Sequence, residues 1–358
     1  MDKILSVIVA TYNMESYLER CLDSMVASEM LPYLEIIVVN DGSRDNSLMI
    51  AKSYLYQYPE SIVVIDKENG HYGSCVMAGL QIAKGKYFRM VDADDWVNTR
   101  GLDSLLKQLM DCNSDLIITL RSEWFLGDSR YPRLTTYSFG KDIVSGKEYN
   151  LKSFCIHEHV ALDEFNMHSM TYKTSVLRAE KGIVLPKGVC YTDFLYCFYP
   201  IDRAQTISIF NIPLYIYYIG RDEQSVSSRS LTRNLHHIST VLNCMINYYE
   251  NTSQEMIIRK NQMHFIRKAL GFFSGCLFCR KIITDIEYEE VFPILLFIER
   301  HHIPNHIYEK KYFMLFRKFK AKVFLNFCLW IHAITHRKFV RNPSVLQYVP
   351  EKKNVVEY

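Results

Sequence analysis

The stretch Val91-Asp92-Ala93-Asp94-Asp95-Trp96 decides how the rest of this sequence is interpreted. It places three carboxylates within four residues, directly after the apolar segment 87–91. Side chains alternate along an extended backbone, so Asp92 and Asp94 should point to the same side. Mg²⁺ and Mn²⁺ prefer oxygen ligands and commonly leave positions open for substrate phosphates. The pattern therefore predicts a divalent cation site, although Asp is also common in turns and at helix N-caps.

Short apolar segments alternate with amphipathic helices on both sides of this stretch. Their content of Val and Ile, with few polar interruptions, is typical of strands buried on both faces. Regular alternation of strands and helices predicts an α/β fold with a largely parallel sheet. The expected strands are residues 4–10, 34–39, 62–65, 87–91 and 116–120, and helices are expected over 16–26, around Ala51, around Leu80 and over 102–109.

Polar residues follow the first four strands where each strand ends. In open α/β sheets ligands bind at this edge, because the loops that leave parallel strands meet there. Several of these polar residues are acidic, so a negatively charged ligand could bind there through a metal ion. A nucleoside diphosphate is the natural candidate. We expect the following residues to surround one crevice: Thr11, Asn13, Asp41, Asn69, Gly70 and Asp92–Asp95.

Composition narrows the class of protein. The chain has 358 residues, of which 49% are hydrophobic, and a formal net charge of +3, so general nucleic-acid binding is not indicated. It contains no uncharged apolar run of the roughly 18 residues that a membrane span needs, and its first residues do not match a signal peptide. The ten cysteines form no paired framework, which favours free thiols and a cytoplasmic location.

Five segments of the first 120 residues, taken together, resemble a known family. They are Ser6–Asn13, Val38–Ser47, Gly73–Gly79, Ala83–Tyr87 and Val91–Trp96. In this order they are similar to family 2 glycosyltransferases of the GT-A fold, of the type that assembles bacterial cell-surface polysaccharides. The resemblance implies a mostly parallel central sheet flanked by helices. Met77 departs from the pattern, since the family often has Asn there for a contact to the donor.

The resemblance also implies roles for the matching residues. Thr11 and Asn13 lie where the family's first loop holds the nucleoside, and Asp41 lies where a carboxylate accepts a hydrogen bond from the base, usually uracil. Asp92 would face the ribose and the metal. Asp94 would be a direct ligand of Mn²⁺ or Mg²⁺, and the metal would neutralise the leaving diphosphate.

Further roles fall in the second half of the chain. Asp193 matches the family's general base, with Thr192 in place of the usual Glu, although an Asp before Phe194 also suits a helix N-cap. Arg221 and Ser225 match an Arg-x-x-x-Ser loop that closes over the donor diphosphate, where a surface turn is the alternative. His168 is a candidate on the acceptor side, or a structural histidine.

Two regions are expected along the chain. Residues 1–230 would form the GT-A catalytic domain, with a donor-binding half at 1–120 and an acceptor and base half at 121–230. Residues 231–358 would form a mainly helical region. Its tail, from about residue 310 to 341, combines lysines and arginines with aromatic residues. This composition is typical of an interfacial helix on an anionic membrane surface, and packing on protein is the alternative.

The sequence thus predicts an inverting, metal-dependent glycosyltransferase. Its donor would be a nucleotide-sugar, usually UDP-linked in this family, and its acceptor a hydroxyl of a saccharide, free or lipid-linked. The protein would lie in the cytoplasm, peripheral on the inner face of the membrane if the tail binds there. Two alternatives stay open: a nucleotidyltransferase that releases pyrophosphate, and a non-catalytic nucleotide-sugar-binding subunit of a larger synthase.

Overall fold

The computed structural model describes most of the chain in two compact units. The described residues are 2–125, 143–156, 165–179, 182–220, 228–252, 255–280 and 282–301, with residues 303, 325 and 329. The first unit contains Met1–Gly220 and Glu255–Asn261, and the second contains Arg221–Gln254 and the chain from Gln262 to Asn354. The predicted division at residue 230 stays a prediction.

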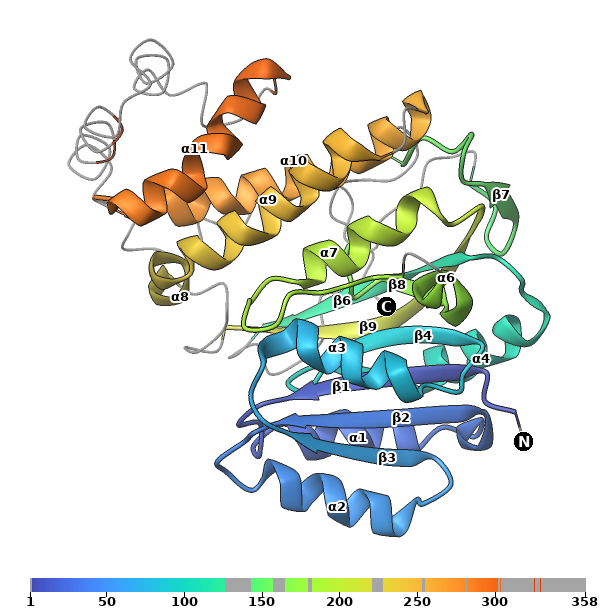
Figure 1. The fold of residues 1–358 in the computed structure, drawn as a ribbon. Helices are drawn as coiled ribbons and strands as arrows, with labels where there is room; N and C mark the ends of the chain where they lie inside the picture. The colour runs from blue at the N-terminus through green and yellow to red at the C-terminus, as the bar shows by residue number, and fades with distance from the viewer. Residues whose placement is uncertain are drawn as a thin grey trace. The chain divides into compact units, whose positions relative to one another are not determined.

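Four parallel strands form the first part of the central sheet. They are β1 (Leu5–Thr11), β2 (Leu34–Asp41), β3 (Ile62–Lys67) and β4 (Tyr87–Asp92). Their spatial order is β3-β2-β1-β4, and their arrows run the same way (Figure 1). The chain therefore moves outward from β1 to β3 and then returns to the other side of β1. The switch point lies between β1 and β4, where Ala10 pairs with Asp92.

Helices cover both faces of these strands. Val7 and Val9 face a core shared with α1 (Leu18–Val26), α2 (Ser47–Gln57) and α4 (Thr99–Asp111). Ile8 points to the other face, toward Gly79 of α3 (His71–Ile82), where an added Cβ would lie 2.8 Å from Ile8 Cδ1. Both faces of β1 are therefore buried, which explains its nearly continuous apolar sequence.

The second part of the sheet mixes strand directions. The long strands β6 (Leu116–Phe125) and β9 (Thr206–Ile219) are parallel to each other. Between β4 and β6 lies β8 (Met170–Lys173), antiparallel to both, and β5 (Trp96–Val97) and β7 (Glu148–Asn150) pair antiparallel with β9. A mostly parallel sheet flanked by helices confirms the predicted fold class.

Short helices connect these strands, and longer ones follow them. The short ones are η1 (Leu31–Tyr33), α6 (Thr174–Arg178), α7 (Asp193–Phe198) and η3 (Tyr199–Asp202). From residue 228 on, the described chain is helical, as predicted: α8 (Ser228–Arg233), α9 (Leu235–Asn251), α10 (Met256–Phe278) and α11 (Asp285–Arg300). None of the helices in the described residues is long and apolar enough to cross a bilayer. The predicted basic and aromatic tail lies outside the described residues.

Within the second unit, polar contacts of Glu290 join α11 to α9. His236 Nδ1 lies 2.6 Å from Glu290 Oε1, and Asn243 Nδ2 donates to the Glu290 carbonyl at 3.0 Å. A capping box starts α11, because Thr284 and Glu287 each bond the other's backbone N–H.

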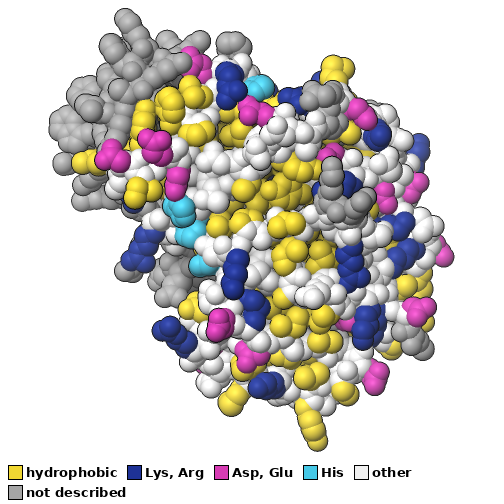
Figure 2. Space-filling model, in the orientation of Figure 1, with side chains coloured by type: hydrophobic (Ala, Val, Ile, Leu, Met, Phe, Trp, Pro, Cys, Tyr) yellow, Lys and Arg dark blue, Asp and Glu magenta, His cyan; other side chains and the backbone are white. Residues whose placement is uncertain are grey.

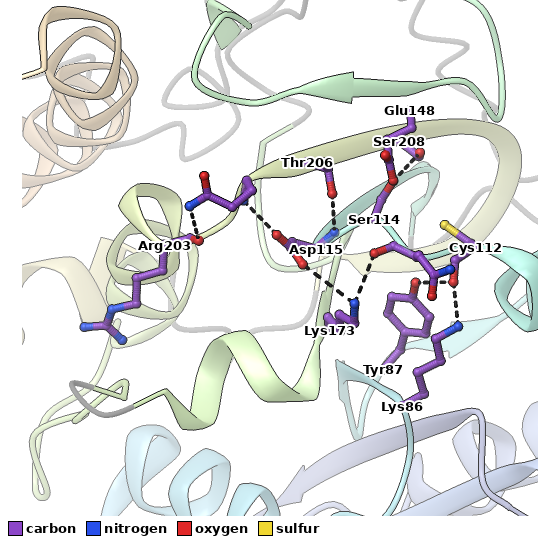
Figure 3. A network of polar contacts seen from close by, with 12 residues as sticks. Lys86, Tyr87, Cys112, Ser114, Asp115, Glu148, Lys173, Arg203, Thr206 and Ser208 are labelled. Carbon is purple, nitrogen blue, oxygen red and sulfur yellow. Dashed lines mark hydrogen bonds and ion pairs between the residues drawn. The ribbon is translucent and has the colours of Figure 1, made fainter.

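Polar contacts at the amino ends of β4 and β6 are structural. Lys86 Nζ and Tyr87 Oη both donate to the carbonyl of Cys112, just after α4 ends, and Lys173 Nζ lies 4.0 Å from Asp115 Oδ1 (Figure 3). Cations near a helix C-terminus satisfy carbonyls that have no partner within the helix. Over the face drawn in Figure 2, basic and acidic side chains are interspersed, in keeping with the net charge of +3.

Candidate functional site

The loops after β1 and β2 are tied together by side chains. Asn13 Oδ1 accepts a hydrogen bond from the N–H of Arg44 at 2.8 Å, and the N–H of Asn13 donates to Ser43 Oγ at 3.0 Å. Thr11 is 1% exposed, and its hydroxyl donates to the carbonyl of Val9 at 3.3 Å. Of the two residues predicted at the nucleoside, Asn13 is exposed and Thr11 is not.

The loop after β3 is joined to the end of β2 through Asp41. This carboxylate is buried, and its Oδ1 accepts from the N–H of Gly70 at 2.9 Å and from Lys67 Nζ. Asn69 is exposed beside it, and a Cβ on Gly42 would lie 3.0 Å from the Asn69 nitrogen. The first three predicted loops therefore meet, as expected from parallel strands.

The acidic stretch at the end of β4 divides into an accessible and a buried part. The Asp92 side chain is 28% exposed, whereas Asp94 and Asp95 are buried. Asp95 accepts from Tyr215 Oη at 2.6 Å and from the N–H of Tyr218 at 2.8 Å. Burial, with smaller effects of the Asp94 and Asp92 charges, raises the pKa of Asp95 well above its usual range. Asp95 thus anchors the stretch to β9.

Tyr215 connects the acidic stretch to His168. Its hydroxyl also accepts from the N–H of Asp92 at 3.2 Å, and its ring centroid lies 4.7 Å from that of His168. The imidazole stacks on Tyr217 as well, at 4.8 Å and 28°, and its Nε2 lies 3.6 Å from Asp92 Oδ2. The structure therefore brings His168, predicted near the acceptor, beside the accessible carboxylate of Asp92.

Arg89 supports this arrangement from inside the protein. Its guanidinium is 1% exposed and donates to the hydroxyls of Thr119 and Thr171 and to the carbonyl of His168. Burial lowers the pKa of Arg89 to about 10, which leaves it cationic at neutral pH. Arg89 thus holds the backbone of His168, whose side chain lies beside Asp92.

The residues around Asp92 fit a divalent cation. Ligand atoms of Asp92, Asp95 and His168 lie within 4.8 Å of one another, but both oxygens of Asp95 already accept hydrogen bonds. Asp92 and His168 are thus better placed to bind a cation than Asp95. Asp94 lies close enough to raise the pKa of Asp95. Carboxylate oxygens with one imidazole suit Mn²⁺ or Mg²⁺. The ligand role of Asp94 stays a prediction.

Asp193, the predicted base, is the first residue of α7, and Thr192 occupies the N-cap position. Its surroundings include Tyr72, whose pKa is raised by burial and then by the charges of Asp92 and Asp193. Both carboxylates therefore lie near one hydroxyl. The segment before Asp193 is held against α3, because the N–H of Gly188 donates to the Gly70 carbonyl at 2.9 Å.

Backbone strain gathers in the same loops. Among the described residues, the non-glycine residues with positive φ are Asn13 (53°), His71 (61°) and Tyr191 (63°). They lie after β1, after β3 and just before Asp193. Such conformations are uncommon for residues with a side chain and cluster at functional sites. Cys190 Sγ lies 3.5 Å from His71 Nδ1, so two of the strained loops also touch.

Sequence reasoning missed several residues of the site and named others that stay untested. Arg221 and Ser225 lie outside the described residues. Tyr72, Tyr215 and Arg89 were not predicted. For Arg89 the signal was a charged residue inside an apolar strand, whereas no local pattern distinguishes either tyrosine.

The site and sheet define the class of protein. A mostly parallel sheet with an acidic strand end at its switch point is the GT-A-like arrangement. The structure resembles S. aureus TarS with a TM-score of 0.57 and 19% identity, covering 82% of this chain and 48% of that one. The 1–349 fragment of TarS in complex with UDP-GlcNAc gives 0.53 and 17%, covering 94% and 92%. At these identities the likeness concerns the fold.

Sequence comparisons show which family the first half of the chain resembles. Residues 6–169 match the model of Glycosyl transferase family 2. Glycosyltransferase GlyA of Streptococcus pneumoniae is 35% identical over 118 residues, which are 33% of this chain and 17% of the relative. The minor teichoic acid biosynthesis protein GgaB of Bacillus subtilis is 36% identical over 102 residues, 28% of this chain and 11% of the relative. The matches thus span less than a fifth of either relative. The resemblance to family 2 glycosyltransferases that the sequence motifs predicted is thus confirmed over residues 6–169.

Proposed function

We propose that this enzyme transfers a sugar from a UDP-sugar to a saccharide hydroxyl with inversion at the anomeric carbon, in the assembly of a cell-surface polysaccharide. The observation that carries this proposal is that the carboxylates of Asp92 and Asp193 both lie close enough to the buried Tyr72 hydroxyl to add to the rise in its pKa. One carboxylate ends β4 at the donor-side loops and the other begins α7. A single crevice can then hold a donor and a base on opposite sides of the reacting carbon.

The chain's own residues would perform the proton transfer. Asp193 takes the proton of the acceptor hydroxyl while its oxygen forms a bond to the anomeric carbon. The bond from that carbon to the diphosphate oxygen breaks, and the nucleoside diphosphate leaves from the opposite side. Asp193 is half-buried at the start of a helix, where the macrodipole favours its charged form.

Donor binding is assigned to the first three loops and the end of β4. Asn13 and Asn69 are exposed for contact with the nucleoside, and Asp41 is oriented by Gly70 and Lys67 to accept from the base. Asp92, Asp94 and His168 would hold Mn²⁺ or Mg²⁺. The bound cation would supply positive charge to the leaving diphosphate.

The choice of UDP and of a cell-surface product is supported by the comparisons. TarS shares the fold and was crystallised with UDP-GlcNAc, and GgaB is described as a teichoic acid biosynthesis protein. We infer the same nucleotide and the same class of product for this chain. Attachment of the tail to an anionic membrane, close to a lipid-linked acceptor, is part of the proposal and rests on sequence alone.

The experiment that tests the proposal is product analysis with Asp193→Asn. The wild type should release UDP from a UDP-sugar, form a product of inverted anomeric configuration and release no pyrophosphate. The variant should bind UDP as tightly as the wild type and lose turnover by at least about a hundredfold, as expected for a lost general base. Full turnover by Asp193→Asn, or release of pyrophosphate, would overturn the mechanism.

A further inference from the structure

Arg20 contacts the acidic stretch from α1. Its Nη2 donates a hydrogen bond to the main-chain carbonyl of Asp94 at 2.8 Å. The side chain is half-buried, and its Nε is buried without a hydrogen-bond partner among the described residues. The contact with Asp94 joins residues that are 74 positions apart, so it is a tertiary contact and not a local turn.

Aromatic rings enclose the guanidinium. Its Cζ lies 3.9 Å from the ring centroid of Trp96, 4.6 Å from that of Tyr218 and 5.9 Å from that of Tyr17. Stacking of this kind suits the planar, weakly hydrated guanidinium and does not suit a lysine ammonium. Arg20 is therefore held in one orientation, which aims its N–H group at the Asp94 carbonyl.

This contact restrains the turn that carries the acidic stretch. The N–H of Asp95 donates to the carbonyl of Asp92 at 3.0 Å, which closes the turn. On one side Asp95 is anchored by Tyr215 and Tyr218. On the other side Arg20 holds the peptide between Asp94 and Asp95. The directions of the Asp92 and Asp94 side chains follow from the orientation of these peptides.

We propose that Arg20 is a positioning residue for cation and diphosphate binding, acting through the Asp94 main chain without contacting either ligand. The inference rests on the proposed function, because it assigns the turn of Asp92–Asp95 to the cation. Arg20 also places a positive charge beneath this cluster of carboxylates.

The chain offers a matched control. Arg178 makes the same type of contact elsewhere, since its Nε donates to the carbonyl of Leu80 at 3.0 Å and its Nη2 to that of Ala83 at 2.7 Å. These carbonyls lie at the end of α3, outside the acidic stretch. Arg20→Lys and Arg178→Lys each replace a planar guanidinium by an ammonium. A general loss of stability should affect both variants, whereas a positioning effect should appear only in the first.

The experiment combines two readouts on the full-length protein. Hydrogen exchange without ligands measures the protection of the Asp95 amide, and calorimetry measures Mn²⁺-dependent binding of UDP. For Arg20→Lys we expect exchange at Asp95 to be at least about tenfold faster and UDP binding about tenfold weaker, in line with the loss of the stacked guanidinium and of its directed hydrogen bond. Arg178→Lys should leave both unchanged. If Arg20→Lys does not fold, Trp96→Phe, which reduces the stacking surface, should show the same two changes.

The outcomes separate this inference from the proposed function. If the wild type shows no Mn²⁺-dependent UDP binding, the proposed function fails, and the exchange measurement still decides whether Arg20 holds the turn. If the wild type binds UDP with Mn²⁺ while Arg20→Lys keeps wild-type affinity and wild-type exchange at Asp95, the positioning role is refuted and the function stands.

Discussion

Replacement of Tyr215 by Phe would remove one hydroxyl that makes two buried hydrogen bonds. The hydroxyl donates to Asp95 Oδ2 at 2.6 Å and accepts from the N–H of Asp92 at 3.2 Å. A hydrogen bond to an ionised group is worth about 1.5–3 kcal/mol, and a neutral one about 0.5–1.5 kcal/mol. Because Asp95 and Tyr215 are both 0% exposed, water cannot replace the lost partner. We expect Tyr215→Phe to lower the free energy of unfolding by about 3 kcal/mol.

Urea unfolding of the apoprotein would measure this loss. Both variants are measured at the same pH, because burial raises the pKa of Asp95 and the charged form makes the stronger bond. Tyr172→Phe is the matched control, since Tyr172 is also fully buried and its hydroxyl makes one neutral hydrogen bond, to the Cys197 carbonyl at 2.9 Å. Its expected loss is about 1 kcal/mol. Equal losses in the two variants would refute the view that Tyr215 anchors the acidic stretch.

Three further predictions concern other parts of the chain. Gly85→Ala should destabilise the protein by about 3 kcal/mol or more in thermal or urea unfolding, because the added Cβ would lie 2.3 Å from the Ser6 backbone nitrogen. Gly271→Ala should stabilise it by about 1 kcal/mol, because an added Cβ there meets nothing within 4 Å. The reverse order of stabilities would contradict the packing. Burial would raise the pKa of Asp45, but hydrogen bonds from Ser47 and from the Glu15 N–H outweigh burial and lower that pKa. The Asp45 carboxylate therefore stabilises the fold above about pH 4, and this stabilisation is lost as the pH falls through the lowered pKa. Asp45→Asn should therefore be less stable than the wild type at pH 7, and the difference should shrink as the pH falls through the lowered pKa of Asp45. A difference that stays constant with pH would exclude this origin. Vesicles with anionic lipids should sediment the full chain and not a chain truncated before Tyr308, and equal sedimentation would remove the tail from the membrane hypothesis.

The part of the fold that local patterns encode could be predicted from the sequence. The strands β1 and β2 are rich in Val and Ile and buried on both faces, and the polar residues that follow β1 to β4 mark the functional edge. The antiparallel strand β8 was not predicted, because four residues show no periodicity and its position between β4 and β6 depends on pairing with both.

Most of the site residues that were predicted follow strand ends, and His168 and Asp193 are the exceptions. The pair of Asp95 and Tyr215 is 120 positions apart, and a tyrosine in an apolar strand is equally typical of a core. Arg20 reads as a solvated charge on an amphipathic helix, and only the structure shows that Trp96 and Tyr218 enclose it. Thr11 matches the family pattern, yet its side chain is buried. The sequence of a single strand does not show whether its last residue is buried or open to a ligand.

Calorimetric titration of UDP, GDP, CDP and TDP, each with and without Mn²⁺, tests the central claim most directly. The account predicts that UDP binds, that binding requires Mn²⁺, and that Asp92→Ala or Asp94→Ala removes the metal-dependent part. Asp103 offers a control, because it is half-buried in α4, outside the acidic stretch, and its carboxylate accepts from Ser28 Oγ at 2.5 Å. Asp103→Ala should bind UDP as the wild type does. Failure of every nucleotide to bind with Mn²⁺, or unchanged UDP binding by both acidic-stretch variants, would contradict the account.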